Sequence, residues 1–323
     1  MSSSTPIVIL GGSGFIGTRL AIRLTELGRD IRIGDLNPSQ KFPDIHRICD
    51  VRKASSMGEI LTGASCVINL AAEHRDDVRP ISRYQETNVQ GAKEVCRAAT
   101  ESGIQNLIFT SSVAVYGSHP SPVDESGPFE PFNAYGETKL LAESVYLEWA
   151  KQDASRSLVI IRPTVVFGEG NRGNVFNLLN QIASGRFIMV GPGTNRKSMA
   201  YVGNVAEVLV HSLTIGPGIH IFNYADGPDM NMNDLVALVQ EKLGRQKPSG
   251  WGIPLPLALA GGFTFDAVAR LTGRTFPIST IRIRKFCENT QFKADKIRAL
   301  GFNSPFSLNQ ALANTITTEF GQV

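Results

Sequence analysis

The sequence predicts an α/β protein, built on a doubly wound parallel sheet with a smaller C-terminal lobe. Two observations predict the sheet. Short apolar segments alternate with amphipathic ones over the first two-thirds of the chain, and a glycine-rich turn follows the first apolar segment. Strands that alternate with helices form βαβ units, in which the strands run parallel. A third observation predicts the lobe, since beyond about residue 165 segments rich in glycine and proline replace the alternation.

The expected elements follow from the spacing of apolar residues and from the residues that end each run. Strands are expected over residues 6–10, 30–34, 66–71, 106–110 and 158–162, and helices over 15–27, 88–100 and 135–152. Gly28 is the expected end of the first helix. A chain of 323 residues is long enough for about two domains. We place the first at 1–165 and the second mainly at 166–323, with segments that interleave with the sheet.

The composition is that of a globular protein without strong charge bias. Hydrophobic residues make up 42% and charged residues 19%, and 32 basic residues stand against 29 acidic ones, so nucleic acid is not an expected partner. The four cysteines form no CxxC pair, so we expect neither a metal site nor a disulfide framework. Free thiols are typical of a reducing cytosol and no secretory signal is visible, so we expect a cytoplasmic protein.

The longest apolar stretch covers residues 253–268. It contains Pro254, Pro256 and Asp266, and it is shorter than the ~20 residues that a membrane-spanning helix needs. We therefore expect a buried helix or a flap on the substrate side, and not a membrane anchor.

The glycine-rich turn predicts a site for a dinucleotide. Gly11, Gly14 and Gly17 follow the first expected strand and open the first expected helix. Glycine at these positions permits a tight turn, close approach of the backbone to a pyrophosphate, and close packing of helix on strand. The N-terminus of the helix, at Phe15 and Ile16, adds N–H donors and a positive dipole for the phosphates.

An acidic residue at the end of the second strand favours NAD over NADP. Asp35 follows Gly17 by 18 residues, where a carboxylate accepts hydrogen bonds from the adenosine ribose and repels a 2′-phosphate. The alternative is an ordinary turn aspartate before Asn37. Asp50 and Val51 close the next strand-like segment and are candidates for the adenine edge, or for an ordinary loop.

A tyrosine and a lysine four residues apart predict proton-transfer chemistry. Tyr135 and Lys139 share one face of the expected helix. A nearby ammonium stabilises the tyrosinate form, so such a tyrosine can exchange a proton with an alcohol near neutral pH. Ser112 lies just past the strand at 106–110, where its hydroxyl can bond the same oxygen or cap the strand end.

Together these motifs resemble the extended short-chain dehydrogenase/reductases, of the nucleotide-sugar epimerase/dehydratase type. The similar stretches are GGSGFIG (11–17), IGDLN (33–37), VINLAA (67–72), TNVQGAKEV (87–95), FTSSVAVYG (109–117), YGETK (135–139) and IIRPTVVFG (160–168). The resemblance implies a Rossmann-type domain, bound NAD(P), and a C-terminal lobe that holds a nucleoside diphosphate sugar. It also implies a homodimer, formed through the helices at 88–100 and 135–152.

Matched residue by residue, the resemblance assigns roles. Ser112, Tyr135 and Lys139 take the catalytic positions, and Asn88 takes that of a helix asparagine behind the site. The expected cofactor-binding residues are Gly11, Gly14, Phe15, Ile16, Gly17, Asp35, Asp50, Val51, Leu70, Ala71, Ala72, Tyr135, Lys139, Arg162 and Pro163.

One departure from the family pattern narrows the chemistry. Family dehydratases and decarboxylases carry an acidic residue after the catalytic serine or threonine, and here Val113 and Ala114 stand in its place. Water elimination across the sugar ring would lack its acid, so we expect neither activity.

The sequence signals for substrate-binding residues are weaker than those for the cofactor. The expected substrate-binding residues are His74, Ser112, Asn174, Arg196, Lys197 and Arg282. The last three are candidates for a diphosphate, which cations bind. Arg282 and Arg284 alternate with isoleucines, which predicts one face of a strand. The alternatives are a structural histidine, a turn asparagine and a solvated cationic surface.

These features predict an NAD-dependent enzyme that acts at C4 of a UDP-hexose or UDP-N-acetylhexosamine. An epimerase would regenerate NAD in each turnover. A 4-keto-6-deoxy sugar-nucleotide reductase would use the same residues and consume the reduced cofactor. A 3β-hydroxysteroid-type dehydrogenase and a non-catalytic NAD-binding protein are further alternatives. Residues 251–286 more loosely resemble bacterial surface-polysaccharide enzymes of the first two kinds.

Overall fold

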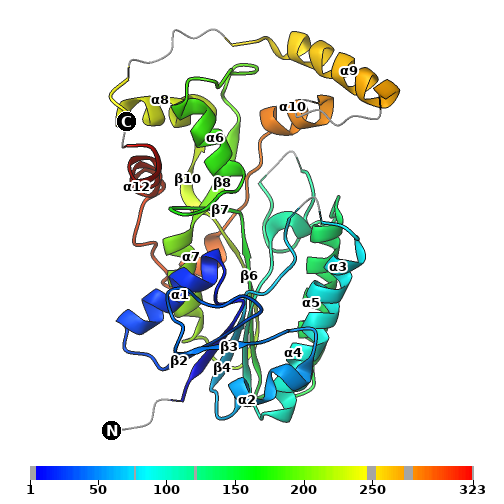
Figure 1. The fold of residues 1–323 in the computed structure, drawn as a ribbon, viewed down its shortest axis with the longest axis vertical. Coiled ribbons are helices and arrows are strands. Elements are labelled where there is room, and N and C mark those ends of the chain that lie inside the picture. The colour runs from blue at the N-terminus through cyan, green and yellow to red at the C-terminus, as the bar shows by residue number, and fades with distance from the viewer. Residues whose placement is uncertain (1–4, 76–77, 120–121, 246–251, 273–278, 322–323) are drawn as a thin grey trace.

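A seven-stranded parallel sheet forms the centre of the computed structural model, which describes residues 5–75, 78–119, 122–245, 252–272 and 279–321. The strand order is β3-β2-β1-β4-β5-β6-β9 (Figure 1). The strands are β1 (Ile7–Leu10), β2 (Ile31–Asp35), β3 (His46–Ile48), β4 (Cys66–Asn69), β5 (Asn106–Thr110), β6 (Ser157–Pro163) and β9 (Gly218–Tyr224). This confirms the predicted Rossmann-type α/β fold.

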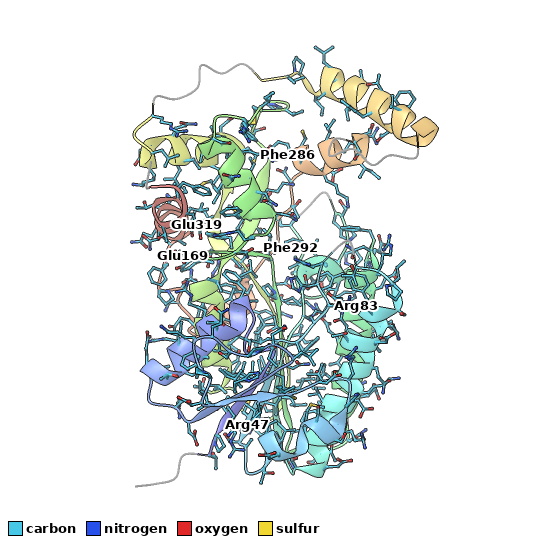
Figure 2. The ribbon with its side chains drawn as sticks, viewed as in Figure 1. Arg47, Arg83, Glu169, Phe286, Phe292 and Glu319 are labelled. Carbon is cyan, nitrogen blue, oxygen red and sulfur yellow. The ribbon has the colours of Figure 1, made fainter. Side chains whose placement is uncertain are left out.

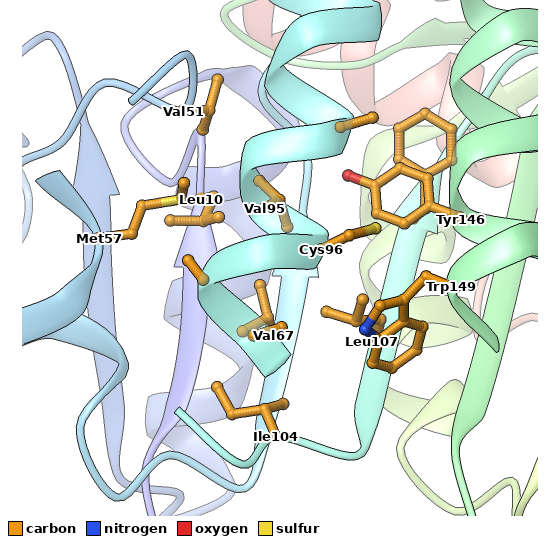
Figure 3. Packing of buried hydrophobic residues seen from close by; sticks show 14 of the residues in the cluster. Leu10, Val51, Met57, Val67, Val95, Cys96, Ile104, Leu107, Tyr146 and Trp149 are labelled. Atoms are coloured by element: carbon orange, nitrogen blue, oxygen red, sulfur yellow. The ribbon is translucent and has the colours of Figure 1, made fainter. Parts of the chain in front are cut away.

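Helices cover both faces of this sheet. Successive strand residues point to opposite faces, and in β1 the residues on both faces are apolar and buried. Ile7 and Ile9 of β1 pack under α1 (Phe15–Glu26) and α7 (Val202–Ser212). Val8 and Leu10 pack under α2 (Gly58–Leu61), α4 (Gly91–Glu101) and α5 (Ala134–Lys151). Figure 3 shows this second layer, where Val95, Cys96, Tyr146 and Trp149 fill the space between the helices and the strands.

A second lobe lies over the carboxyl ends of the strands (Figure 1). Its three-stranded sheet has the order β10-β8-β7, and helices surround it. The elements are β7 (Val165–Phe167), α6 (Asn174–Ala183), β8 (Arg196–Tyr201), β10 (Asp226–Asn231), α8 (Met232–Lys242) and α12 (Leu308–Phe320). The chain leaves this lobe after β8 to build α7 and β9, so β9 pairs with β6 in the main sheet.

Short elements complete the described chain. They are η1 (Ala54–Ser56), α3 (Ser82–Tyr84), η2 (Gln85–Gln90), η3 (Val113–Val115) and α11 (Asp295–Ala299). The element η2 is a π-helix, so the helix expected from residue 88 begins with a wider turn before α4. Single π turns are frequent at functional sites.

Of two expectations about the C-terminal half, one is wrong and the other is wrong in part. Most of the stretch 253–268 lies in a helix, α9 (Leu255–Thr272), but one side of that helix faces solvent, so the buried-helix alternative is wrong, while the flap alternative stays a prediction. Residues 281–284 lie in a helix, α10 (Thr280–Cys287), and not in a strand. Four alternating residues are too few to distinguish a strand from a helix, because an alternation this short also arises where a helix exposes one of its apolar residues, as α10 exposes Ile281. Within the described ranges, none of the helices is long and apolar enough to cross a membrane.

Candidate active site

The glycine-rich turn lies where β1 meets β4, at the point where the strand order reverses. Gly11 has φ +77°, and a Cβ atom there would stand 2.6 Å from the backbone nitrogen of Ala71. A Cβ on Gly17 would collide with the carbonyl oxygen of Gly11. These two positions therefore accept only glycine, and the turn places Gly11 against Leu70 and Ala71, which follow β4 and precede Ala72. Ligands of doubly wound sheets bind in this crevice.

Asp35 closes the side of the crevice at the end of β2. One carboxylate oxygen accepts a hydrogen bond from the N–H of Ser13 at 3.1 Å, and the other accepts one from the N–H of Asn37 at 2.9 Å. The carboxylate is therefore fixed beside the glycine turn. Arg32 is turned away, since its guanidinium donates to the carbonyls of Ile60 and Thr62 at 2.9 and 2.7 Å. Negative charge at this position fits an unphosphorylated ribose.

Asp50 and Val51 are occupied by other contacts. Two nitrogens of Arg52 donate to the two carboxylate oxygens of Asp50, each at 2.8 Å, and these bonds lower the pKa of that carboxyl group. Val51 is buried and lies against Gly91 of α4, where a Cβ would stand 3.2 Å from a Val51 methyl group. The backbone N–H of Asp50 also donates to the hydroxyl of Ser56 at 3.0 Å, so the role proposed for these two residues at the adenine edge stays a prediction.

The first turn of α5 is placed directly on the turn that carries Ser112. Asn133 caps α5 by accepting a hydrogen bond from the N–H of Gly136 at 2.8 Å. Gly136 packs on the carbonyl oxygen of Ala114, to which a Cβ would come within 2.5 Å. Ser112 follows β5 and accepts a hydrogen bond from the N–H of Ala114 at 3.1 Å. This contact brings Tyr135 and Ser112 to the same edge of the sheet.

Lys139 lies one turn along α5 from Tyr135 and is buried. Its amino group donates a hydrogen bond to the backbone carbonyl of Thr110 at 2.7 Å and lies 4.7 Å from the ring centroid of Phe109. Removal of water lowers the pKa of Lys139 to about 7, against a smaller upward effect of the Glu143 carboxylate. The lysine can therefore gain or lose a proton near neutral pH.

Arg162 lies in a buried polar network behind Lys139. Its guanidinium donates to both carboxylate oxygens of Glu143, at 2.9 and 2.6 Å, and to the hydroxyl of Tyr116 at 2.6 Å. It also lies over the rings of Tyr116 and Phe129. Arg162, an expected cofactor contact, thus holds β6 against α5. Pro163, the next residue, ends the strand. The sequence carried no signal for this network beyond the four-residue spacing of Lys139 and Glu143.

Asn88 fixes the loop on the other side of the site. Its amide donates to the hydroxyl of Thr138 at 2.9 Å and to the carbonyl of Glu73 at 3.1 Å, and it accepts from the N–H of Glu73 at 2.9 Å. The π-helix η2 is thereby tied both to α5 and to the loop that carries His74, whose side chain is exposed.

Three buried hydroxyls mark the carboxyl ends of β5 and β6. Those of Thr110, Ser111 and Thr164 have no hydrogen-bond partner among the residues that the structure describes. Buried polar groups normally have partners. A ligand at this edge would supply them, so the residues present fit a dinucleotide that runs from the glycine turn to Ser112.

The expected substrate residues lie on several different elements. Asn174 is exposed at the start of α6. Arg196 donates to the carbonyl of Asp229 at 2.6 Å, and Lys197 donates to the carbonyl of Lys285 at 2.8 Å and to the hydroxyl of Thr290 at 3.1 Å. Burial lowers the pKa of Lys197. The backbone of Arg282 lies in α10, but its side chain is outside the described part of the chain.

Within the described residues, no group of histidine, cysteine, aspartate or glutamate side chains could hold a metal ion. All four cysteines are free thiols.

The chain is similar to known proteins over nearly its whole length. The model of a family described as "NAD dependent epimerase/dehydratase family" matches residues 7–225. The N-acetyl-alpha-D-glucosaminyl-diphospho-ditrans,octacis-undecaprenol 4-epimerase of Escherichia coli O157:H7 is 48% identical, over 97% of this chain and 95% of that protein. The UDP-glucose 4-epimerase of Vibrio cholerae is 28% identical, over 83% and 85%. The solved structure of UDP-N-acetylglucosamine 4-epimerase from Bacillus cereus has the same fold, with a TM-score of 0.77 and 15% identity over 98% of this chain and 100% of that one.

Proposed function

Because the chain belongs to the NAD-dependent epimerase/dehydratase family, we propose that it is an NAD-dependent epimerase that inverts C4 of a diphosphate-linked hexose or N-acetylhexosamine. One observation carries the choice among the family's activities. A protein 48% identical over 97% of this chain is a 4-epimerase of a diphosphate-linked N-acetylglucosamine. The absence of a carboxylate at Val113 and Ala114 agrees with it, because dehydration would need an acid there.

The cofactor site is the crevice between β1 and β4. The glycine turn and the N-terminus of α1 hold the pyrophosphate of NAD, and Asp35 holds the adenosine ribose. Bound NAD supplies a reversible hydride acceptor for C4 of the sugar.

The chain's own residues move the proton. Tyr135 takes the proton from the C4 hydroxyl and later returns it. Ser112 donates a hydrogen bond to the same sugar oxygen. Lys139, when protonated, favours the tyrosinate because its charge is buried and poorly screened. For inversion, the keto sugar would have to turn over between the two proton transfers, so that the hydride would return to its other face.

The substrate is proposed to carry a diphosphate on either a nucleotide or a polyprenol. The relatives named above differ in this respect, since one acts on a UDP-sugar and the other on an undecaprenol-linked one. Asn174, Arg196, Lys197, Arg282 and His74 stay the proposed contacts. A diphosphate would have to displace the backbone carbonyls that Arg196 and Lys197 now bind.

The direct test is interconversion of C4 epimers. Purified protein with NAD is incubated in one tube with UDP-N-acetylglucosamine and in another with prenyl-diphosphate-linked N-acetylglucosamine. We expect the galacto epimer to appear in at least one tube without net change in the absorbance of reduced nicotinamide. Stoichiometric loss of NADH with a 4-keto-6-deoxy sugar nucleotide would instead establish the reductase, and silence in both tubes would reject the epimerase.

We further propose a cytoplasmic homodimer. The free thiols suit a reducing compartment. The outer side of α5 carries Leu141, which is 49% exposed, as a pairing of α4 and α5 across a dimer would require. Light scattering tests it, since Leu141→Glu should turn a dimer into a monomer. A wild-type monomer at micromolar concentration would reject the proposal.

A further inference from the structure

The helices α9 and α10 form a pair at one end of the molecule (Figure 1). One side of α9 packs on α10. Gly262 is buried there, and a Cβ on it would stand 2.9 Å from the side chain of Ile283. The carboxylate of Asp266 accepts a hydrogen bond from the N–H of Thr280 at 3.1 Å. This pair, defined as residues 255–272 and 280–287, is called the docking pair below.

The other side of α9 is apolar and exposed. Leu257 is 65% exposed and Phe263 is 70% exposed, and Phe265 and Val268 are also exposed. On α10, Ile281 is 67% exposed. Several large apolar side chains exposed on one pair of helices are typical of an interaction site. The side of α9 that packs on α10 is therefore covered, whereas Leu257 and Phe263 remain largely exposed to solvent.

The sequence of the docking pair and its connection is basic. From the first residue of α9 to the last residue of α10 the sequence has five basic residues and one acidic residue, while the rest of the chain has 27 basic and 28 acidic ones. The acidic residue, Asp266, is the one that bonds Thr280. Arg284 and Lys285 on α10 are exposed. The net positive charge of the protein therefore comes from this segment.

We propose that the docking pair seats the protein on an anionic lipid bilayer, with α9 lying in the plane of the interface. A helix with a bulky apolar side next to basic residues binds in this way, and it does not need the length of a spanning helix. Basic residues gain energy from the negative surface of an anionic leaflet. A protein partner would not by itself require an excess of basic residues around an apolar side.

The docking pair is joined to the loops around the candidate active site. Phe286 at the end of α10 accepts a hydrogen bond from the side-chain amide of Asn195 at 2.7 Å, and Lys285 lies 3.7 Å from the ring centroid of Phe132 (Figure 2 labels Phe286 and Phe292). Phe292 then packs on Tyr116, four residues after Ser112. The membrane would thus lie on the side of the substrate lobe. Resting on the proposed function, this places a polyprenol-linked sugar diphosphate within reach of the site.

Vesicle flotation of the full chain tests the proposal. The vesicles contain phosphatidylethanolamine and phosphatidylglycerol in one set, and phosphatidylcholine alone in the other. We expect the protein to float with the anionic set and to remain largely free of the neutral set. Leu257→Ser/Phe263→Ser/Val268→Ser should abolish flotation, and Arg284→Gln should weaken it about fivefold. The matched control Ile48→Ser/Ile219→Ser/Leu300→Ser changes exposed apolar residues elsewhere and should float as the wild type does.

Two results would overturn the proposal. The first is that the wild type does not float with anionic vesicles. The second is that light scattering finds an oligomer for the wild type and a monomer for the α9 triple variant, which would mean that a second copy of the chain covers this surface. Epimerisation of a short-chain prenyl-diphosphate sugar in detergent provides the separate readout. The triple variant should keep it, because a dispersed substrate needs no bilayer. If the wild type floats but epimerises nothing, the proposed function fails and the docking surface stands.

Discussion

The amino group of Lys139 donates its hydrogen bond to the backbone carbonyl of Thr110, the last residue of β5. This bond ties the helix that carries Tyr135 to the strand that ends beside Ser112. The lysine therefore has a structural contact as well as its proposed electrostatic role, and the two can be separated by experiment.

The stability of the protein should depend on pH through Lys139. An unfolded lysine keeps its proton up to a pKa of about 10.4, whereas burial lowers the folded pKa to about 7. Between these values the unfolded state binds more protons, so this group makes the folded state more stable as pH rises. Lys139→Met has no such group, so its free energy of unfolding lacks this rise with pH. Between pH 7 and about pH 9 the free energy of unfolding of wild type should therefore gain about 2–3 kcal/mol relative to that of the variant. Urea unfolding across this range measures it, and a difference that does not change with pH would contradict the buried, weakly basic lysine.

Removal of the tyrosine hydroxyl should stop the reaction and leave cofactor binding intact. Tyr135→Phe keeps the ring but cannot accept the proton of the C4 hydroxyl, so turnover should fall by about 10²–10⁴-fold. The rate of epimer formation measures the loss, and NAD binding serves as the control. Activity within tenfold of wild type would assign the proton transfer to another group.

The glycine turn should tolerate no side chain at Gly11. In Gly11→Ala the new methyl group would stand 2.6 Å from the backbone of Ala71, in a backbone conformation with positive φ. We expect NAD affinity to fall at least tenfold while the protein remains folded. Gly28→Ala is the matched control, since Gly28 also has positive φ but nothing lies within 4 Å. That variant should lose about 1 kcal/mol of stability and keep its NAD affinity. Equal loss of affinity in both variants would remove the steric explanation.

The pair of Arg162 and Glu143 should contribute to stability only while both partners are present. Glu143→Ala leaves the guanidinium of Arg162 buried without its bidentate partner and should cost about 3–5 kcal/mol. Replacement of both by apolar residues, Glu143→Leu/Arg162→Met, should recover much of this cost. Denaturant unfolding of the single and double variants measures the coupling. Costs that simply add would show that the two side chains do not act as a unit.

Local patterns predicted the sheet and its glycine-rich turn because these features are set within a few residues. Gly11 and Gly17 must be glycine for reasons of space, and the buried strands carry continuous apolar runs. The helix that carries Tyr135 begins one residue before its expected start, since Asn133 provides a cap.

Contacts between distant residues could not be predicted in the same way. The bond from Lys139 to Thr110 spans 29 residues, and that from Asn88 to Thr138 spans 50. Such pairs depend on how the elements pack. The sequence also suggested free cations at Arg196 and Lys197, but backbone carbonyls from other segments bind both. The exposed side of α9 was missed because an apolar run alone does not show which neighbours cover it.

The return of the chain to the main sheet limits how this protein can be recombined with its relatives. β9 pairs with β6 along seven residues, from Ser157 with Gly218 to Pro163 with Tyr224. A chimera made with a single crossover near residue 165 would therefore take β9 from a different parent than β6, and it would place seven foreign residues against a buried strand. A graft of the second lobe from a relative therefore needs at least two inserts, one on each side of α7 and β9, with that segment kept from the parent that supplies the sheet.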